Sequence, residues 1–150
     1  MRINIINPKY LTDNHLIAEY RETKMSTYYY VRSKSSKNGI DKSKISERYT
    51  LNKGHGYMWF NKFGFIDKRF NSICLEMRER GFKTNFTVLN FEGIESEVFG
   101  DFIPTQEDKR INLDRILIRI AKQPNWYKFR GESISDWNSF YEDLFKKEKL

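Results

Sequence analysis

The feature that most constrains the fold is a run of apolar residues between Gly54 and Gly81, recurring at spacings of three and four. This periodicity predicts one long amphipathic α-helix. Gly64 is a weak point in the run, which allows a break near that residue, and Gly81 predicts a left-handed helix stop. His55, at the start, is interpreted as structural, with a ligand or DNA contact as the alternative. The apolar residues are Tyr57, Met58, Phe60, Phe63, Ile66, Phe70, Ile73, Cys74 and Met77. The cationic residues expected on the outer face are Lys68, Arg69, Arg78 and Arg80.

A second amphipathic pattern occupies residues 13–22, DNHLIAEYRE. On a helical wheel at about 100° per residue, one face is apolar (the back), the opposite face is ionisable (the front), and Arg21 lies on the flank between them. Thr12 or Asp13 is the expected N-cap, and the helical pattern continues towards Arg32. On composition alone, this is an amphipathic helix with a solvated charged face. The front consists of His15, Ala18, Glu19 and Glu22, and the back of Leu16, Ile17 and Tyr20.

A third helix is predicted over residues 112–122, stopped by Pro124. Arg115, Arg119 and Lys122 line up on one face, as either a phosphate clamp or a solvated face. Aromatic and cationic residues come directly after this helix. They could stack on unpaired bases, or they could seal the core. Under the second interpretation, Trp126 in particular is expected to be buried. These residues are Trp126, Tyr127, Lys128, Phe129 and Arg130.

The fold class predicted is all-α: a single compact domain of about three main helices with long loops, plus an extra C-terminal helix. Residues 33–44 are polar, basic and rich in serine, and predict an exposed loop. Residues 83–104 are expected to be irregular. Ser135 or Asp136 caps a last helix, which packs back on the domain or, as the alternative, forms a dimer contact. We expect a core domain over residues 1–131 and a helical extension over residues 132–150.

A net charge of +7 and a pI near 9.4 favour a polyanionic partner, nucleic acid first and an acidic membrane surface second. The single Cys74 excludes an intramolecular disulfide framework and a cysteine-rich metal site. The sequence shows no signal peptide and no membrane-spanning apolar stretch, so an intracellular location is expected. No metal-ligand spacing, phosphate-binding glycine loop or Ser–His–Asp arrangement stands out.

Several short motifs resemble one family of DNA-repair enzymes. The most specific combination is MRINI at the start, followed by HLIAEYRE (15–22) and, near the end, PNWYK (124–128). Further motifs match that family in the same order, with almost no change in length, over residues 1 to about 131. They are KIS (44–46), KGH (53–55), KR (68–69), RGF (80–82), GDFIP (100–104) and IAKQPNWYK (120–128). Together they resemble the pyrimidine-dimer DNA glycosylases with AP-lyase activity, the T-even phage endonuclease V type.

The resemblance implies that the N-terminal α-amine, here that of Met1, attacks the sugar, with Glu22 as the catalytic carboxylate. An α-amine, with a reference pKa near 7.7–8.0, is partly neutral at neutral pH, whereas a lysine near 10.4 is protonated. The partner implied is double-stranded DNA with a damaged base, bound by a monomer without metal or cofactor, in the cytoplasm or in the host cytoplasm if the protein is viral. The DNA-binding residues expected are Arg2, Asn14, His15, Arg21, Arg115, Arg119, Lys122, Trp126, Tyr127 and Lys128.

Two departures from the family pattern bear on the substrate. The family begins Met-Thr-Arg, whereas Arg2 follows Met1 directly here, so Met1 is expected to be retained with its α-amine at the threonine's position. Met25 stands where the family has a basic residue. The lesion is therefore a cyclobutane dimer, an abasic site or another altered base. Two further hypotheses are a non-catalytic DNA-binding protein and a basic helical interaction module.

Overall fold

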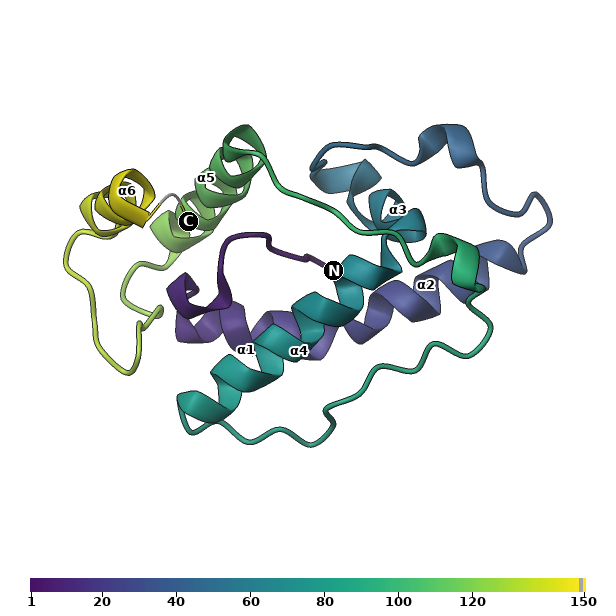
Figure 1. Cartoon of the computed structure of the whole chain (residues 1–150). Helices are drawn as coiled ribbons and strands as arrows, with labels where there is room; N and C mark the ends of the chain where they lie inside the picture. Colours follow the sequence, from purple (N-terminus) through teal and green to yellow (C-terminus); the bar gives the residue numbers. More distant parts are fainter. Residues whose placement is uncertain (149) are drawn as a thin grey trace.

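The computed structural model describes residues 1–148 and residue 150, and its regular elements are helical. Within the described residues there is no β-strand, and only isolated bridges join Lys62 to Phe99 and Phe129 to Glu132. The all-α prediction is confirmed (Figure 1). The α-helices are α1 (Asp13–Glu22), α2 (Lys24–Lys34), α3 (His55–Met58), α4 (Phe63–Glu79), α5 (Gln106–Lys122) and α6 (Trp137–Glu148). Short 3-10 turns occupy Pro8–Tyr10, Lys42–Lys44, Asn52–Gly54, Trp59–Asn61 and Ser96–Val98.

Helix α1 begins where its capping residue predicts. The Thr12 hydroxyl accepts a hydrogen bond from the His15 amide at 3.0 Å, which satisfies a free N–H of the first turn. The predicted continuation towards Arg32 is present as α2, but Thr23 separates the two helices. The Thr23 hydroxyl donates back to the Glu19 carbonyl at 2.6 Å, a bond that tends to bend helices.

The long apolar run is divided, because another segment fills the break. The backbone leaves helical geometry at Lys62, with φ −131° and ψ 34°, two residues before Gly64. A Cβ on Gly64 would lie 2.8 Å from the carbonyl oxygen of Phe99 and 2.9 Å from that of Gly100, so only glycine allows this approach. At the other end of α4, Gly81 has a φ of +82°, and the Phe82 amide donates to the Met77 carbonyl at 2.8 Å. The predicted left-handed stop is therefore confirmed.

Helix α4 carries much of the core and packs across α1 (Figure 1). Its buried apolar side chains are Phe63, Ile66, Phe70, Ile73, Cys74 and Met77. The prediction that its cations lie outside holds for Lys68 and Arg78 but is wrong for Arg69 and Arg80, whose side chains are only 5% and 2% exposed. Both have acidic partners from distant parts of the chain, and periodicity alone contains no information about such partners.

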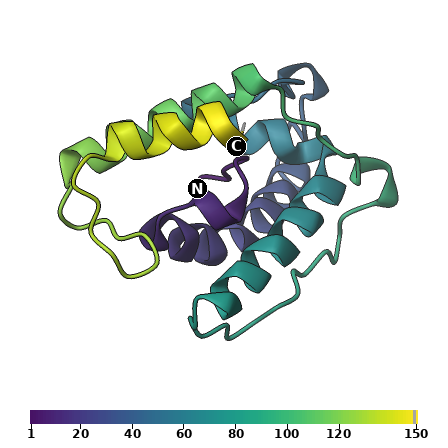
Figure 2. The ribbon, with the colours of Figure 1, turned by 60° about the vertical axis from the view of Figure 1, so that its left-hand side comes forward.

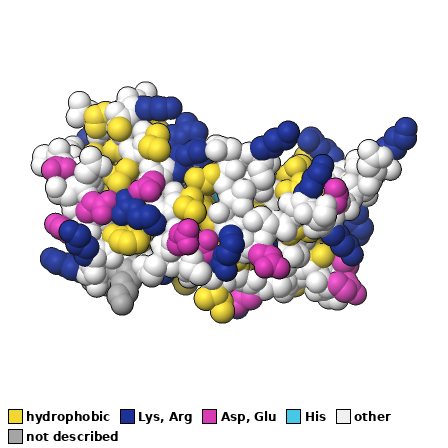
Figure 3. All heavy atoms as spheres, turned by 90° about the horizontal axis from the view of Figure 1, so that it is seen from above, with side chains coloured by type: hydrophobic (Ala, Val, Ile, Leu, Met, Phe, Trp, Pro, Cys, Tyr) yellow, Lys and Arg dark blue, Asp and Glu magenta, His cyan; other side chains and the backbone are white. Residues whose placement is uncertain are grey.

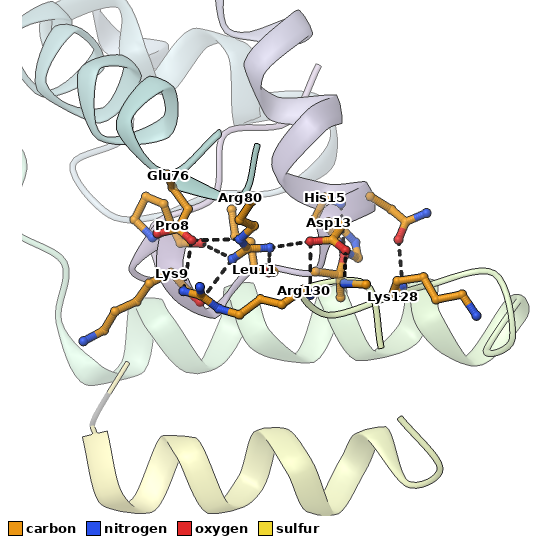
Figure 4. A network of polar contacts seen from close by, with 12 residues as sticks. Pro8, Lys9, Leu11, Asp13, His15, Glu76, Arg80, Lys128 and Arg130 are labelled. Atoms are coloured by element: carbon orange, nitrogen blue, oxygen red, sulfur yellow. Dashed lines mark hydrogen bonds and ion pairs between the residues drawn. The ribbon is translucent and has the colours of Figure 1, made fainter. Parts of the chain in front are cut away.

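Arg80 joins three parts of the chain in one polar network (Figure 4). Its guanidinium pairs with Asp13 at 2.9 Å and with Glu76 at 2.8 Å, and it donates to backbone carbonyls of residues 8, 9 and 11. Asp13 in turn accepts the backbone amides of Arg130, at 3.2 Å, and Gly131, at 2.8 Å. The start of α1 is thereby fixed to the end of α4 and to the segment after α5.

Helix α5 starts six residues before the predicted helix. Thr105 and Asp108 form a capping box, in which each side chain accepts from the other residue's backbone amide. The first residues of α5 are polar, and apolar periodicity begins only at Leu113, which explains the difference. Leu113, Ile116 and Ile120 face the core.

Helix α6 lies alongside α5 in both ribbon views (Figures 1 and 2). Asp136 accepts from the Ser139 amide at 3.1 Å, which decides between the two predicted caps. The Tyr141 hydroxyl donates to the Tyr10 carbonyl at 2.7 Å, and Arg110 of α5 pairs with Glu142 at 2.6 Å. The division of the chain at residue 131 stays a prediction. Among the described residues, no helix is both long and apolar enough to cross a membrane.

Candidate active site

The N-terminal segment, residues 1–7, forms no helix or strand. Side chains from distant elements hold its backbone. The Arg2 amide donates to Glu22 Oε2 at 3.3 Å, and the Ile3 amide donates to His55 Nε2 at 2.8 Å. Asn112 Oδ1 accepts the amides of residues 5 and 6 at 2.7 and 3.2 Å. Ile3, Ile5 and Ile6 are buried, and the two residues that precede them line a solvent-open cavity.

This cavity has a volume of about 300 Å³ and lies between the N-terminal segment, α1, α5 and the segment that follows α5. It is here called the N-terminal pocket. Its lining residues are Met1, Arg2, Asn4, His15, Ala18, Glu19, Glu22, Arg115, Ile116, Arg119 and Tyr127. Residues separated by more than 100 positions in sequence therefore meet around one cavity.

Two carboxylates line the pocket, but their surroundings differ. Glu19 is 1% exposed, and its oxygens accept from Arg69 Nε at 2.7 Å, Arg69 Nη2 at 3.0 Å and Asn4 Nδ2 at 2.9 Å. Glu22 is half-buried and receives the Arg2 amide. One residue spans at most about 3.6 Å, so the Met1 nitrogen lies within about 7 Å of Glu22 Oε2. Of the two carboxylates, Glu22 is the one that accepts the backbone amide next to the α-amine.

Three arginines give the pocket a positive wall. Arg115 and Arg119 project from consecutive turns of α5, and Arg2 comes from the N-terminal segment. Arg2 Nη1 is buried without a hydrogen-bond partner among the described residues. Burial, together with the charges of Arg115 and Arg119, lowers the pKa of Arg2 from its usual value. A buried guanidinium nitrogen with unused hydrogens, beside two further guanidinium groups, suits a phosphate oxygen.

His15 is held in a fixed orientation at the edge of the pocket. Its Nδ1 lies 2.7 Å from Thr12 Oγ1, and its ring stacks on Tyr127 with centroids 4.9 Å apart. Burial, followed by the charges of Arg2 and Arg119, lowers its pKa to about 4. The ring is therefore neutral at neutral pH and offers a hydrogen-bonding nitrogen without adding charge.

The structure brings together seven of the predicted site residues in the pocket: Met1, Arg2, His15, Glu22, Arg115, Arg119 and Tyr127. The other five lie outside its lining. Asn14 ties α1 to the segment after α5, accepting from the Lys128 amide at 3.0 Å. Lys128 Nζ donates to Ser133, whereas Arg21 and Lys122 are exposed. Trp126 is 59% exposed, which contradicts the expectation of burial.

Sequence reasoning missed the side chains that hold the terminus, notably Asn4, Tyr49 and Asn112. Each binds a backbone or side-chain group far away in sequence, and no short-range pattern reports such a contact. His55 was interpreted as structural, and its buried hydrogen bond to Ile3 confirms this.

Among the described residues, no group of three or more His, Cys, Asp or Glu is placed to hold a metal ion. Cys74 is buried in α4, and burial raises the pKa of its thiol. On the face seen in Figure 3, Lys and Arg side chains are spread among Asp and Glu rather than gathered in one block.

The model of the family described as pyrimidine dimer DNA glycosylase matches residues 1–90 of the 150-residue chain. The matched part contains the N-terminal segment, α1 and α4, with Met1, Arg2, His15 and Glu22. Helix α5, which carries the other two arginines of the pocket, lies beyond the match.

Proposed function

Because the chain belongs to the pyrimidine dimer DNA glycosylase family, we propose that it cleaves the glycosidic bond at UV-induced pyrimidine dimers and then nicks the strand as an AP lyase. The observation that carries the mechanism is that Met1 and Glu22 line one pocket, with the Arg2 amide bonded to Glu22. The cationic side chains among the described lining residues are all arginines. The α-amine of Met1 is therefore the nucleophilic amine of the pocket.

In the first step, the neutral amine attacks C1′ of the damaged nucleotide as the bond from C1′ to the base breaks. The base leaves with the bonding electrons and takes up a proton. Loss of the amine proton and opening of the sugar ring give an imine between Met1 and C1′. Glu22, as a carboxylate, stabilises the positive charge that develops on the sugar and on the protonated imine.

In the second step, a base removes a proton from C2′, and the C3′–O bond breaks with departure of the 3′ phosphate. Glu22 is the carboxylate placed to accept that proton. Arg2, Arg115 and Arg119 hold the phosphates that flank the sugar, including the leaving group. Water then hydrolyses the imine and restores the free amine.

The other predicted DNA contacts extend this site over a duplex. Lys122 continues the line of Arg115 and Arg119 along α5. Trp126, which is largely exposed, offers an aromatic face for stacking. Asn14, Arg21 and Lys128 are proposed as backbone contacts around the pocket. We propose that the protein acts as a monomer.

Borohydride trapping tests the nucleophile directly. The protein is incubated with duplexes that carry either a cyclobutane dimer or an abasic site, reduced with borohydride, and the cross-link is located by mass spectrometry. The expected cross-link is on the nitrogen of Met1, with both duplexes. A cross-link on a lysine, or none with either duplex, would contradict the proposal. Trapping with the abasic duplex alone would restrict the substrate to abasic sites.

Two variants separate binding from chemistry. A Gly-Ser extension before Met1 should abolish trapping and cleavage, because it moves the amine, while the unfolding midpoint stays the same. Glu22→Gln should retain duplex binding and lose strand cleavage by about 10²-fold or more. The matched control is Glu79→Gln, which removes the same charge from an exposed position on α4. Equal loss in both glutamate variants would show that Glu22 has no special role.

A further inference from the structure

The backbone of Ile3 is held from both sides by two buried side chains. Its amide donates to His55 Nε2 at 2.8 Å, and its carbonyl accepts from the Tyr49 hydroxyl at 2.7 Å. Tyr49 and His55 are each 4% exposed, and Ile3 is fully buried. Both backbone polar groups of Ile3 are thus fixed, two residues from the α-amine.

The hydrogen-bonding roles of both side chains are determined by their neighbours. His55 Nδ1 lies 2.8 Å from the Thr50 carbonyl, so Nδ1 carries the proton and Nε2 is left to accept the Ile3 amide. Burial lowers the pKa of His55 to about 4, so the ring keeps this form at neutral pH. Burial also raises the pKa of Tyr49, whose hydroxyl therefore remains a donor. The Tyr49 and His55 rings meet edge to face, 5.5 Å apart.

From this geometry we propose that Tyr49 and His55 are positioning residues for the nucleophile: they hold Ile3 so that the α-amine of Met1 stays beside Glu22. The inference rests on the proposed function. The α-amine is two residues from Ile3, which span at most about 7 Å. A shift of Ile3 therefore displaces the amine by a distance similar to that shift. Misplacement of a reacting group by about 1 Å can lower a rate 10²-fold.

Neither side chain is accessible to DNA. Both are buried, and the structure places neither among the residues that line the N-terminal pocket. Loosening Ile3 should therefore slow imine formation more than it weakens duplex binding, in which the neighbouring Arg2 is one of several proposed contacts. A DNA-contacting residue would change affinity, and a residue that only stabilises the fold would change neither quantity in the folded protein.

The test compares two variants that make the same chemical change. Tyr49→Phe removes the hydroxyl that holds Ile3. Tyr141→Phe removes an equally buried hydroxyl, which also donates to a backbone carbonyl at 2.7 Å, that of Tyr10 on the other side of the domain. For each variant and for the wild type, single-turnover imine trapping on an abasic duplex and the duplex Kd are measured well below the unfolding midpoint.

Tyr49→Phe should trap about tenfold more slowly than the wild type, with a Kd that changes less than this rate and the cross-link still on Met1. Tyr141→Phe should trap at the wild-type rate. At the second position, His55→Gln keeps an oxygen that accepts the Ile3 amide and should retain most of the rate, whereas His55→Leu should lose it. Equal trapping by Tyr49→Phe and Tyr141→Phe, with an active wild type, overturns this inference alone. Absence of trapping by the wild type overturns the proposed function and this inference together.

Discussion

The buried ion pair between Glu19 and Arg69 allows a quantitative test of how the two pocket carboxylates differ. Its side chains are 0% and 5% exposed, with Arg69 Nε 2.7 Å from Glu19 Oε2. Glu19 also accepts from Asn4, and Arg69 also donates to the Ile6 carbonyl. Glu19→Leu leaves the Arg69 charge buried without its partner, which typically costs about 3–5 kcal/mol of unfolding free energy.

Arg69→Met should cost a similar amount, because it leaves the Glu19 carboxylate without its cation. The double variant removes both charges, and its cost should fall short of the sum of the single variants by about 2–3 kcal/mol. Urea unfolding, followed by the fluorescence of the buried Trp59, measures all three values. Single costs below about 1 kcal/mol, or additive costs in the double variant, would refute the reasoning. No such loss of unfolding free energy is expected for Glu22→Gln, which should alter catalysis rather than stability.

Three further predictions follow from the geometry. Burial lowers the pKa of His15 and of His55 from 6.5 to about 4, so the unfolded chain binds more protons between these pH values. The unfolding free energy should therefore fall as pH decreases from 6.5 to 4, and His55 should account for on the order of 3 kcal/mol of this fall. In urea titrations at each pH, His55→Gln should show a weaker pH dependence than the wild type. Gly64→Ala should destabilise the fold by about 2 kcal/mol or more, because its Cβ would lie within 2.9 Å of two backbone oxygens. In the control Gly39→Ala the added Cβ meets no atom within 4 Å, so this variant should cost only about 1 kcal/mol for its positive φ. Equal shifts of the thermal unfolding midpoint in the two variants would contradict this. Arg119→Gln should weaken binding to undamaged duplex and reduce the slope of log Kd against log salt by about 0.9; an unchanged slope would show that it contacts no phosphate.

Short-range signals in the sequence predict a large part of this fold. The Thr12 cap, the Gly81 stop and the Asp136 cap depend on residues within one helical turn, and each is found where the sequence indicates. Periodicity likewise identifies the buried faces of α4 and α5, because those faces repeat every three or four residues.

Long-range pairing explains the predictions that were wrong. Arg69 and Arg80 occupy positions that a helical wheel assigns to the outside, yet both are buried because acidic partners approach from α1. The break before α4, which the sequence allows near Gly64, also depends on a distant segment, since residues 99–100 approach Gly64 from 35 positions away. A single sequence contains the residues of these pairs but not their distance in space.

The same distinction applies to the candidate site. His15 and Glu22 share a helical face, so the sequence groups them correctly, but Glu19 on that face belongs to the buried ion pair. The two arginines on α5 are grouped with each other by their spacing of four. Only the three-dimensional structure shows that α5 lies opposite α1 and that Arg2 is oriented between them.

An N-terminal nucleophile places a particular demand on a protein. Chain ends normally fray, because few contacts offset the entropy of ordering them. A reacting amine must nevertheless be held within a fraction of an ångström of its productive position. Here no helix or strand orders the first residues, and polar side chains from the core do so instead, through Glu22, His55, Tyr49 and Asn112. The stability of that core and the placement of the amine therefore depend on the same hydrogen bonds, so substitutions around residues 3–6 should reduce catalysis before they unfold the domain.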